Sequence, residues 1–197
     1  MLIDDYLPTY DVSNTYAVTV NDIASKVYPI VRKMDISDAD VTMFLFQLRG
    51  IASKCGGGQE FDLDSLLKMG FVILEEKTNH ELVLGLIGKP WTPDGCLVDF
   101  NAEEFKDFDR PGYAKIAWNF SVKSAGTGIC QLATETRIQC TDEESRWKFG
   151  IYWFFVSSLS GLTRKEILRV LKSQAEKVVI EVNESLLSLA SWLSGPG

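Results

Sequence analysis

The sequence predicts an α+β fold in which a curved antiparallel sheet wraps around a long C-terminal helix, with two short helices after the first strand. Two observations support this fold class. Alternating segments rich in β-branched and aromatic residues are separated by short turns, and strands joined in this way run antiparallel. The later segment 142–172 has helical periodicity and is apolar on nearly all sides, which is typical of a helix buried on most sides. Such a helix can cover the apolar face of the sheet, and a cavity can remain between them.

The first strand is predicted over 15–21, where β-branched residues alternate along the chain. Apolar residues at helical spacing follow over 22–35, and Pro29 indicates that this helix is short or kinked. A second short helix is predicted over 37–50. The consecutive glycines 56–58 indicate a loop, and without a following Lys-Ser/Thr they do not form a phosphate-binding loop.

The middle of the chain is predicted to be a run of strands separated by turns and loops. A short helical turn over 61–70 leads into it, and a polar crossing that tucks in Phe105 and Phe108 precedes the last two strands. The predicted strands span 70–77, 81–88, 96–101, 113–123 and 128–140.

The C-terminal part is predicted to be helical. Thr141 and Glu144 form a candidate capping box at the start of the long helix, and acidic residues fill its first turn. The Ser-rich segment 157–161 indicates a bend or a brief break. Basic residues within 163–172 should form a solvated helix face, with a membrane contact as the alternative.

Composition indicates an ordinary globular protein, with 46% hydrophobic and 24% charged residues in 197. We expect a single domain over 1–197, with a core of about 15–172 and an amphipathic helical extension over about 176–194. The net charge of −7 would repel a phosphate backbone, so we expect no nucleic-acid partner.

No segment has the apolar length that spans a bilayer, so we expect no stable membrane insertion. The acidic N-terminal residues do not resemble a signal peptide, and we therefore expect a cytoplasmic protein. The four cysteines are widely spaced and His80 is the single histidine, which argues against a metal site and against a Ser-His-Asp triad. No motif implies a cofactor.

Alternation assigns the side chains of the last two strands to the two faces of the sheet. The more apolar faces should point inward, which leaves Glu135 and Arg137 on the outer face as weakly interacting charges. A bulge would reverse the faces and place both residues in the cavity. There Glu135 could have a raised pKa and act as an acid or base, and Arg137 could bind a carboxylate or phosphate head group. From the sequence both placements stay open.

The residues predicted to bind a ligand come from three strands, one loop and the long helix. Trp91 lies in a loop flanked by prolines, where it either gates a cavity mouth or packs beneath its own loop. The strand 81–88 is apolar on both faces, so the tail helix or a partner subunit of a homodimer should cover its outer face. The candidates are Leu84, Leu86, Trp91, Ile116, Trp118, Phe120, Thr134, Thr136, Ile138, Ile151, Phe154 and Phe155.

In this order of elements the chain resembles the START-like superfamily, also called SRPBCC, helix-grip or Bet v 1-like. The resemblance covers roughly 15–172 and depends on the long paired strands and on their junction with the final helix, ETRIQCTDEESRWKF. Locally it resembles uncharacterised bacterial members with a TETR…CTDE junction. The extension after about 176 and the glycines 56–58 depart from the usual pattern. The resemblance implies a cavity for a hydrophobic ligand, because members bind lipids, sterols, polyketides and plant hormones, and some are cyclases or hydroxylase subunits.

Three functions follow as hypotheses. The preferred one is binding or carrying a hydrophobic small molecule, of lipid, sterol or polyketide type, between the sheet and the long helix. The second is a cyclase, dehydratase or hydrolase in the same cavity, with Glu135 as acid or base and Arg137 stabilising charge. The third is a non-catalytic interaction subunit whose cavity is filled by its own aromatic side chains. Whether the chain is an enzyme stays open, with the binding protein preferred.

Overall fold

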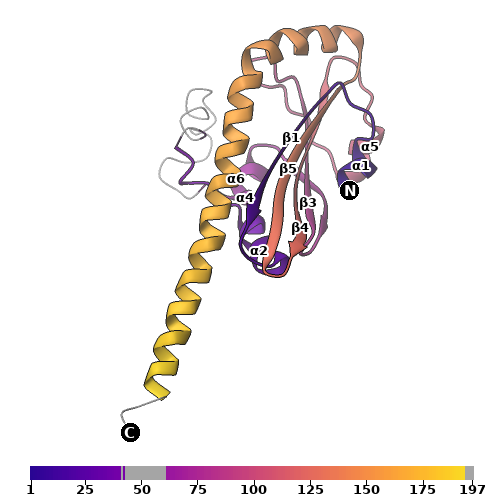
Figure 1. The fold of residues 1–197 in the computed structure, drawn as a ribbon. Helices are drawn as coiled ribbons and strands as arrows, with labels where there is room; N and C mark the ends of the chain where they lie inside the picture. The colour runs from indigo at the N-terminus through magenta and orange to yellow at the C-terminus, as the bar shows by residue number, and fades with distance from the viewer. Residues whose placement is uncertain (41, 43–60, 194–197) are drawn as a thin grey trace.

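The computed structural model describes residues 1–40, 42 and 61–193, with side chains described as far as residue 177. Its elements confirm the predicted α+β class (Figure 1). The predicted helix over 37–50 and the glycines 56–58 lie wholly or largely outside the described residues. The elements are α1 (Leu2–Tyr6), β1 (Val12–Val20), α2 (Ala24–Lys33), α4 (Leu63–Lys68), β2 (Val72–Lys77), β3 (Glu81–Gly88), α5 (Ala102–Asp107), β4 (Ala114–Gly126), β5 (Ile129–Cys140) and α6 (Glu143–Leu193).

The strands form one antiparallel sheet in the order β1-β5-β4-β3-β2. The long pair β4 and β5 is in unbroken register from Ala114 opposite Cys140 to Ser124 opposite Cys130. Its register shifts only between Ser124 and Gly126, at the hairpin end. The bulge that would have exchanged the faces around Glu135 is therefore not present within this paired region.

α6 runs across one end of the sheet, bends, and then continues alongside it (Figure 1). The helix bends without a break, as the Ser-rich segment 157–161 predicts. Two side chains compete there for backbone carbonyls: Thr163 Oγ1 donates to Leu159 O at 3.1 Å, and Arg164 Nη1 donates to Ser160 O at 3.0 Å. Such back-bonding loosens the helical ladder on one side and favours bending.

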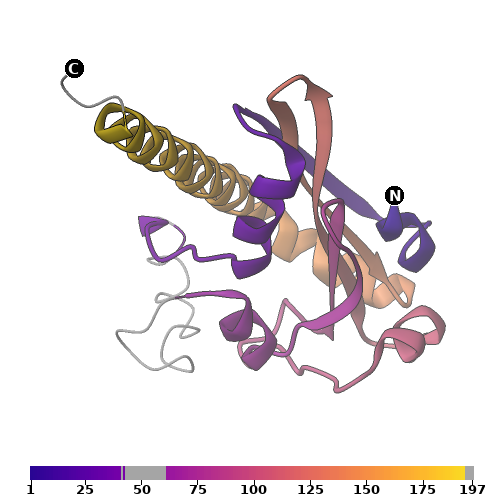
Figure 2. The same cartoon turned by 90° about the horizontal axis from the view of Figure 1, so that it is seen from below.

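Beyond the bend, α6 continues to Leu193 and projects past the sheet in both views (Figures 1 and 2). The predicted extension over about 176–194 is thus a continuation of the long helix. No helix among residues 1–40, 42 and 61–193 combines the length and the apolar character needed to cross a bilayer. The division of the chain into a core and an extension stays a prediction.

Part of the inner face of the sheet packs against helices. Leu84 of β3 and Phe120 of β4 are fully buried there, in one cluster with side chains of α2, α4 and α6. From α6 this cluster includes Ile167 and Leu171, which lie beyond the bend. α2 contributes Val27, Tyr28 and Val31 and continues through Pro29 as a short helix. Burial of this apolar area supplies most of the driving force for folding.

The outer face of the sheet is covered by α1 and α5, which the sequence analysis did not predict as helices. Ile3 of α1 and Phe105 of α5 are fully buried against Val83 and Ile87 of β3. This corrects the expectation that the tail helix or a partner subunit covers the outer face of β3. A five- or six-residue helix carries too little periodic pattern to be recognised in a sequence.

The predicted strand 96–101 is not a strand in the structure. β4 pairs along the whole of one edge of β3, and β2 pairs along the other edge as far as Gly85. Beyond Gly85 the segment makes one backbone hydrogen bond to β3, from Val98 N to Ile87 O at 3.0 Å. The alternating pattern of 96–101 instead places Val98 and Phe100 against the outer core.

Asp142, rather than the predicted Thr141 and Glu144 pair, caps the start of α6. Its carboxylate accepts hydrogen bonds from Ser145 N at 2.8 Å, from Ser145 Oγ and from Gly112 N. Thr141 Oγ1 is instead bonded to the backbone of Tyr113, where it donates to the carbonyl oxygen at 3.0 Å. These bonds lower the pKa of Asp142 to about 2, since they favour its ionised form.

Candidate functional site

A cavity of about 740 Å³ lies between the inner face of the sheet and α6. This volume falls within the range of about 300–1,000 Å³ that is usual for small-molecule sites. The sheet contributes Leu86 from β3, Ile116 and Trp118 from β4, and Thr136 and Ile138 from β5. These residues share one face because side chains two apart on a strand point the same way.

The other walls come from α6, from α4 with the residues after it, and from the loop 89–97. On α6, Phe149, Trp153 and Val156 recur at spacings of three and four residues, which brings them onto one side of the helix. Phe71, after α4, contacts the ring of Trp118 with a centroid distance of 5.9 Å. The walls are therefore mostly apolar and aromatic, with polar groups confined to a few places.

Five of the predicted ligand-binding residues line this cavity: Leu86, Ile116, Trp118, Thr136 and Ile138. Alternation along the strands predicted their orientation, and the regular register of β4 with β5 preserves it. Whether they contact a ligand stays a prediction.

Four other predicted residues lie near the cavity but do not line it. Leu84, Phe120 and Thr134 are fully buried farther along the strands, where the helices close onto the sheet. Thr134 Oγ1 accepts a hydrogen bond from Trp118 Nε1 at 2.7 Å, which fixes the indole ring that does line the cavity. Trp91 is half-buried against the apolar cluster that includes Ile138 and Phe149, whereas its neighbours in the loop 89–97 line the cavity.

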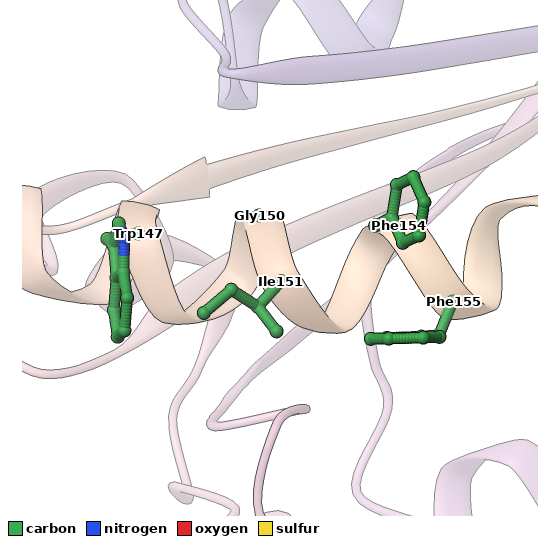
Figure 3. A pocket seen from close by; sticks show the side chains of 5 residues that line it. All are labelled: Trp147, Gly150, Ile151, Phe154 and Phe155. Carbon is green, nitrogen blue, oxygen red and sulfur yellow. The ribbon is translucent and has the colours of Figure 1, made fainter.

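Ile151, Phe154 and Phe155 lie on the opposite side of α6 from the cavity, which corrects their predicted placement. Phe154 is 80% exposed and Phe155 is 72% exposed. With Trp147 and Gly150 they border a shallow hollow whose side chains all come from this one helix (Figure 3). Because this segment is apolar on nearly all sides, periodicity could not distinguish the side that faces the sheet from the side that does not.

Glu135 and Arg137 lie on the outer face of β5, away from the cavity, as the alternation predicted. They are not solvated, however, because both are more than 90% buried beneath the N-terminal segment. Arg137 Nε donates to Glu135 Oε1 at 2.7 Å, its Nη2 pairs with Asp4 at 2.7 Å, and its Nη1 donates to Leu7 O at 3.1 Å. Burial alone would lower the pKa of Arg137, but the hydrogen bonds to Glu135 and Asp4 outweigh it and raise that pKa.

The same network continues through Asn119 to Glu81. Asn119 Oδ1 accepts from Glu135 N at 2.8 Å, and Asn119 Nδ2 donates to Glu81 Oε1 at 2.6 Å. The Glu81 carboxylate also accepts from Leu2 N at 2.9 Å, at the first turn of α1. The network therefore attaches α1 to the sheet. Each of the three guanidinium nitrogens of Arg137 has a partner, and the cavity lies on the other face of the sheet, so Glu135 and Arg137 are not placed to act on a ligand in the cavity.

Arg164 is the cavity-lining group that the sequence analysis did not identify as a site residue. It lies on α6 just past the bend, above the register pair Trp118 and Thr136. Its Nε donates to Thr136 Oγ1 at 2.8 Å, its Nη1 donates to Ser160, and its guanidinium carbon lies 5.8 Å from the centre of the Trp118 ring. In the sequence Arg164 lies among the basic residues of 163–172, which suggested a solvated helix face. The predicted bend did not indicate which of these basic side chains points toward the sheet.

Burial lowers the pKa of Arg164 to about 10, since a poorly hydrated site disfavours the charged form. The group is therefore still cationic at neutral pH. Among the described residues, no carboxylate lies within ion-pair distance of Arg164. This contrasts with Arg137, which pairs with two carboxylates.

The cysteine thiols and acidic groups of the described residues do not form a metal centre. No cluster of three or more His, Cys, Asp or Glu side chains with suitable geometry occurs among the described residues. Burial raises the pKa of the Cys140 thiol to about 12, with the nearby Asp11 charge adding to the effect. Cys140 therefore stays protonated and behaves as an apolar core side chain.

The antiparallel sheet and the long C-terminal helix α6 together have the helix-grip architecture that the sequence predicted. No protein-family model and no curated protein sequence matches the chain. Similar solved structures include the ZhuI aromatase/cyclase from Streptomyces sp. R1128, which is 14% identical, with 85% of this chain and 95% of that chain covered and a TM-score of 0.32.

Two further structures show the same level of similarity. A hypothetical protein from Helicobacter pylori is 13% identical, with 87% of this chain and 93% of that chain covered and a TM-score of 0.43. Truncated norcoclaurine synthase from Thalictrum flavum is 9% identical, with 81% and 92% covered and a TM-score of 0.39. All three TM-scores are below 0.5, so these structures support no conclusion about the activity or the ligand of this chain.

Proposed function

We propose that this protein binds and carries a hydrophobic small molecule, of lipid, sterol or polyketide type, in the cavity between the sheet and α6. The observation that supports this proposal is the cavity itself, about 740 Å³ with walls that are mostly aliphatic and aromatic. Transfer of apolar ligand surface out of water contributes roughly 25 cal/mol per Å², so such walls favour apolar ligands. The described aromatic side chains border the cavity without filling it, which weighs against the filled-cavity alternative.

The placement of Glu135 and Arg137 gives no support to an enzyme that uses them in this cavity, so binding without catalysis is the function we propose. The cytoplasmic location, the absence of a nucleic-acid partner and the homodimer stay predictions from the sequence.

Val156→Trp tests the proposal, because it places a large side chain in the cavity from α6. Leu162→Trp is the matched control, since Leu162 lies on the same helix, is 53% exposed and does not line the cavity. We expect the wild type and Leu162→Trp to bind the neutral apolar dye Nile red with the same affinity, measured by fluorescence titration. Val156→Trp should bind it at least tenfold more weakly.

Native mass spectrometry of the purified protein provides an independent measurement. An adduct of lipid-like mass that is present in the wild type and Leu162→Trp, and lost in Val156→Trp, would support the proposal. Equal dye binding by all three proteins, or no binding by the wild type, would contradict it.

A further inference from the structure

A cation at the inner end of an apolar cavity restricts the chemistry of the ligand, and this inference rests on the function proposed above. Beyond the pair Trp118 and Thr136, the next residues along the strands belong to the closed core, so Arg164 marks the floor of the cavity. The loop 89–97 follows the end of β3 that pairs with Ala114, and thus borders the opposite end. Between the two ends the walls are mainly apolar.

The guanidinium of Arg164 has donors to spare. Nε donates to Thr136 Oγ1 and Nη1 donates to Ser160. Nη2 donates to no group among the described residues, although it carries two N–H donors. Every fully buried side-chain nitrogen among the described residues has a hydrogen-bond partner. Because Nη2 has none, it is not fully buried and is accessible from the space around it.

The surroundings do not supply a counter-charge. Asp94 is the one carboxylate among the cavity-lining residues, and it accepts from Cys96 Sγ at 3.3 Å, in the loop at the other end. The remaining contact of Arg164 is with the face of the Trp118 ring, which attracts a cation but does not neutralise it. Water can meet the unused donors of Nη2, but only an anionic ligand supplies both acceptors and the missing counter-charge.

We propose that the ligand is an amphiphile with a carboxylate head, which Arg164 binds at the floor of the cavity while the apolar part extends toward the loop 89–97. Carboxylate oxygens are good acceptors for guanidinium N–H groups, and such charge-assisted bonds are about twice as strong as neutral ones. One guanidinium supplies one positive charge, which a carboxylate balances. A phosphate monoester, with a charge of about −1.5 to −2, would leave negative charge uncompensated at the floor, because the other lining cation, Lys89, belongs to the loop at the opposite end.

A matched pair of probes, dodecanoate and dodecanol, separates the head group from the chain. We expect the wild type to bind dodecanoate at least tenfold more tightly than dodecanol, measured by isothermal titration calorimetry at pH 7.5. Arg164→Met keeps most of the apolar stem and removes the charge. It should weaken dodecanoate binding about tenfold or more, and leave dodecanol binding unchanged or tighter.

Arg169→Met is the control, because Arg169 is exposed on the same helix and does not line the cavity. It should retain the preference of the wild type. Dodecyl phosphate, as a third probe, should bind the wild type more weakly than dodecanoate, and the reverse order would overturn the choice of a carboxylate.

The outcomes distinguish this inference from the proposed function. If the wild type binds both probes equally, the cavity binds apolar chains and the head-group inference is wrong. If it binds neither dodecanoate, dodecanol nor Nile red, the proposed function fails and the inference fails with it. The comparison of probes on the wild type decides the matter even if Arg164→Met does not fold.

Discussion

Two arginines on opposite faces of the sheet show that the partners of a side chain, rather than its type, decide its role. Arg137 has carboxylate or carbonyl partners at all three guanidinium nitrogens and attaches the N-terminal segment to the sheet. Arg164 has partners at two nitrogens and none of them is a carboxylate. Arg137 therefore has a structural role, whereas the third nitrogen of Arg164 has no described partner, as the proposed carboxylate head requires.

Arg137→Met should strongly destabilise the protein. It leaves the buried Glu135 carboxylate without its cation and frees Asp4 and Leu7 at the N-terminal segment. Breaking a buried pair in this way costs about 3 kcal/mol or more in the free energy of unfolding. Denaturant unfolding measures this loss. Arg146→Met removes a more exposed ion pair with Asp11 and should cost much less, so equal losses would contradict the structural role of Arg137.

The cap of α6 should make stability depend on pH. The folded-state pKa of Asp142 is about 2, below its ordinary value of 3.8. A lowered folded-state pKa means that the stabilisation is present above pH 4 and is lost as the pH falls through about 2. Asp142→Asn should therefore be less stable than the wild type at pH 5–7, and the difference should shrink as the pH falls from 4 to 2. A difference that is constant over this range would contradict the charge effect.

At the scale of the element, α6 has two apolar sides, one buried and one exposed. Phe149 is 2% exposed and packs at the end of the cavity, whereas Phe154 is 80% exposed on the other side of the same helix. Beyond the bend the helix closes the inner core with Ile167 and Leu171. The first part of α6 thus forms a wall of the cavity, and the part beyond the bend packs into the inner core. The bend allows one helix to contact the sheet in both ways.

Phe149→Ala and Phe154→Ala should differ sharply in their effects on unfolding. Truncation of a buried phenylalanine costs about 3–5 kcal/mol, and we expect the lower end for Phe149 because it borders a cavity. Phe154→Ala should change the free energy of unfolding by less than about 0.5 kcal/mol. Chemical denaturation at two protein concentrations checks both values. A large loss for Phe154→Ala that varies with concentration would show that this side of α6 is covered in solution.

At the scale of the whole molecule, the sheet separates a polar outer network from an apolar inner cavity. Adjacent residues of β5 belong to different systems: Thr136 bonds to Arg164 in the cavity wall, and Arg137 bonds to Glu135 under α1. Mutations on the two faces share no described partner, so their effects should be independent.

Ligand-induced stabilisation tests this independence. A ligand at 100 times its dissociation constant stabilises a folded protein by about 2.7 kcal/mol. Dodecanoate at that excess should raise the Tm of the wild type and of Arg137→Met by similar amounts, although Arg137→Met starts from a lower Tm. Arg164→Met should show little rise at the same dodecanoate concentration. Loss of the rise in Arg137→Met, measured by scanning calorimetry, would show that the two faces are coupled.

Much of the fold could be predicted from the sequence because the long elements carry strong periodic patterns. The alternation in β4 and β5 predicted which side chains share a face, and the regular register kept Ile116, Thr136 and Ile138 together in one wall. The apolar segment after Asp142 predicted the long helix. These are local properties, since each depends on the spacing of residues within a single element.

The sequence by itself determined the order of the long elements, the faces of the central strands and the presence of a helix able to cover them. Only the tertiary structure decided which side of α6 faces the sheet, that α1 buries Glu135 and Arg137, and that Arg164 turns into the cavity. The physical reason is that a helix apolar on all sides has no local pattern that selects one side. That choice depends on contacts of α6 with residues far away in the sequence, such as the hydrogen bond from Lys172 to the carbonyl oxygen of Thr19 in β1.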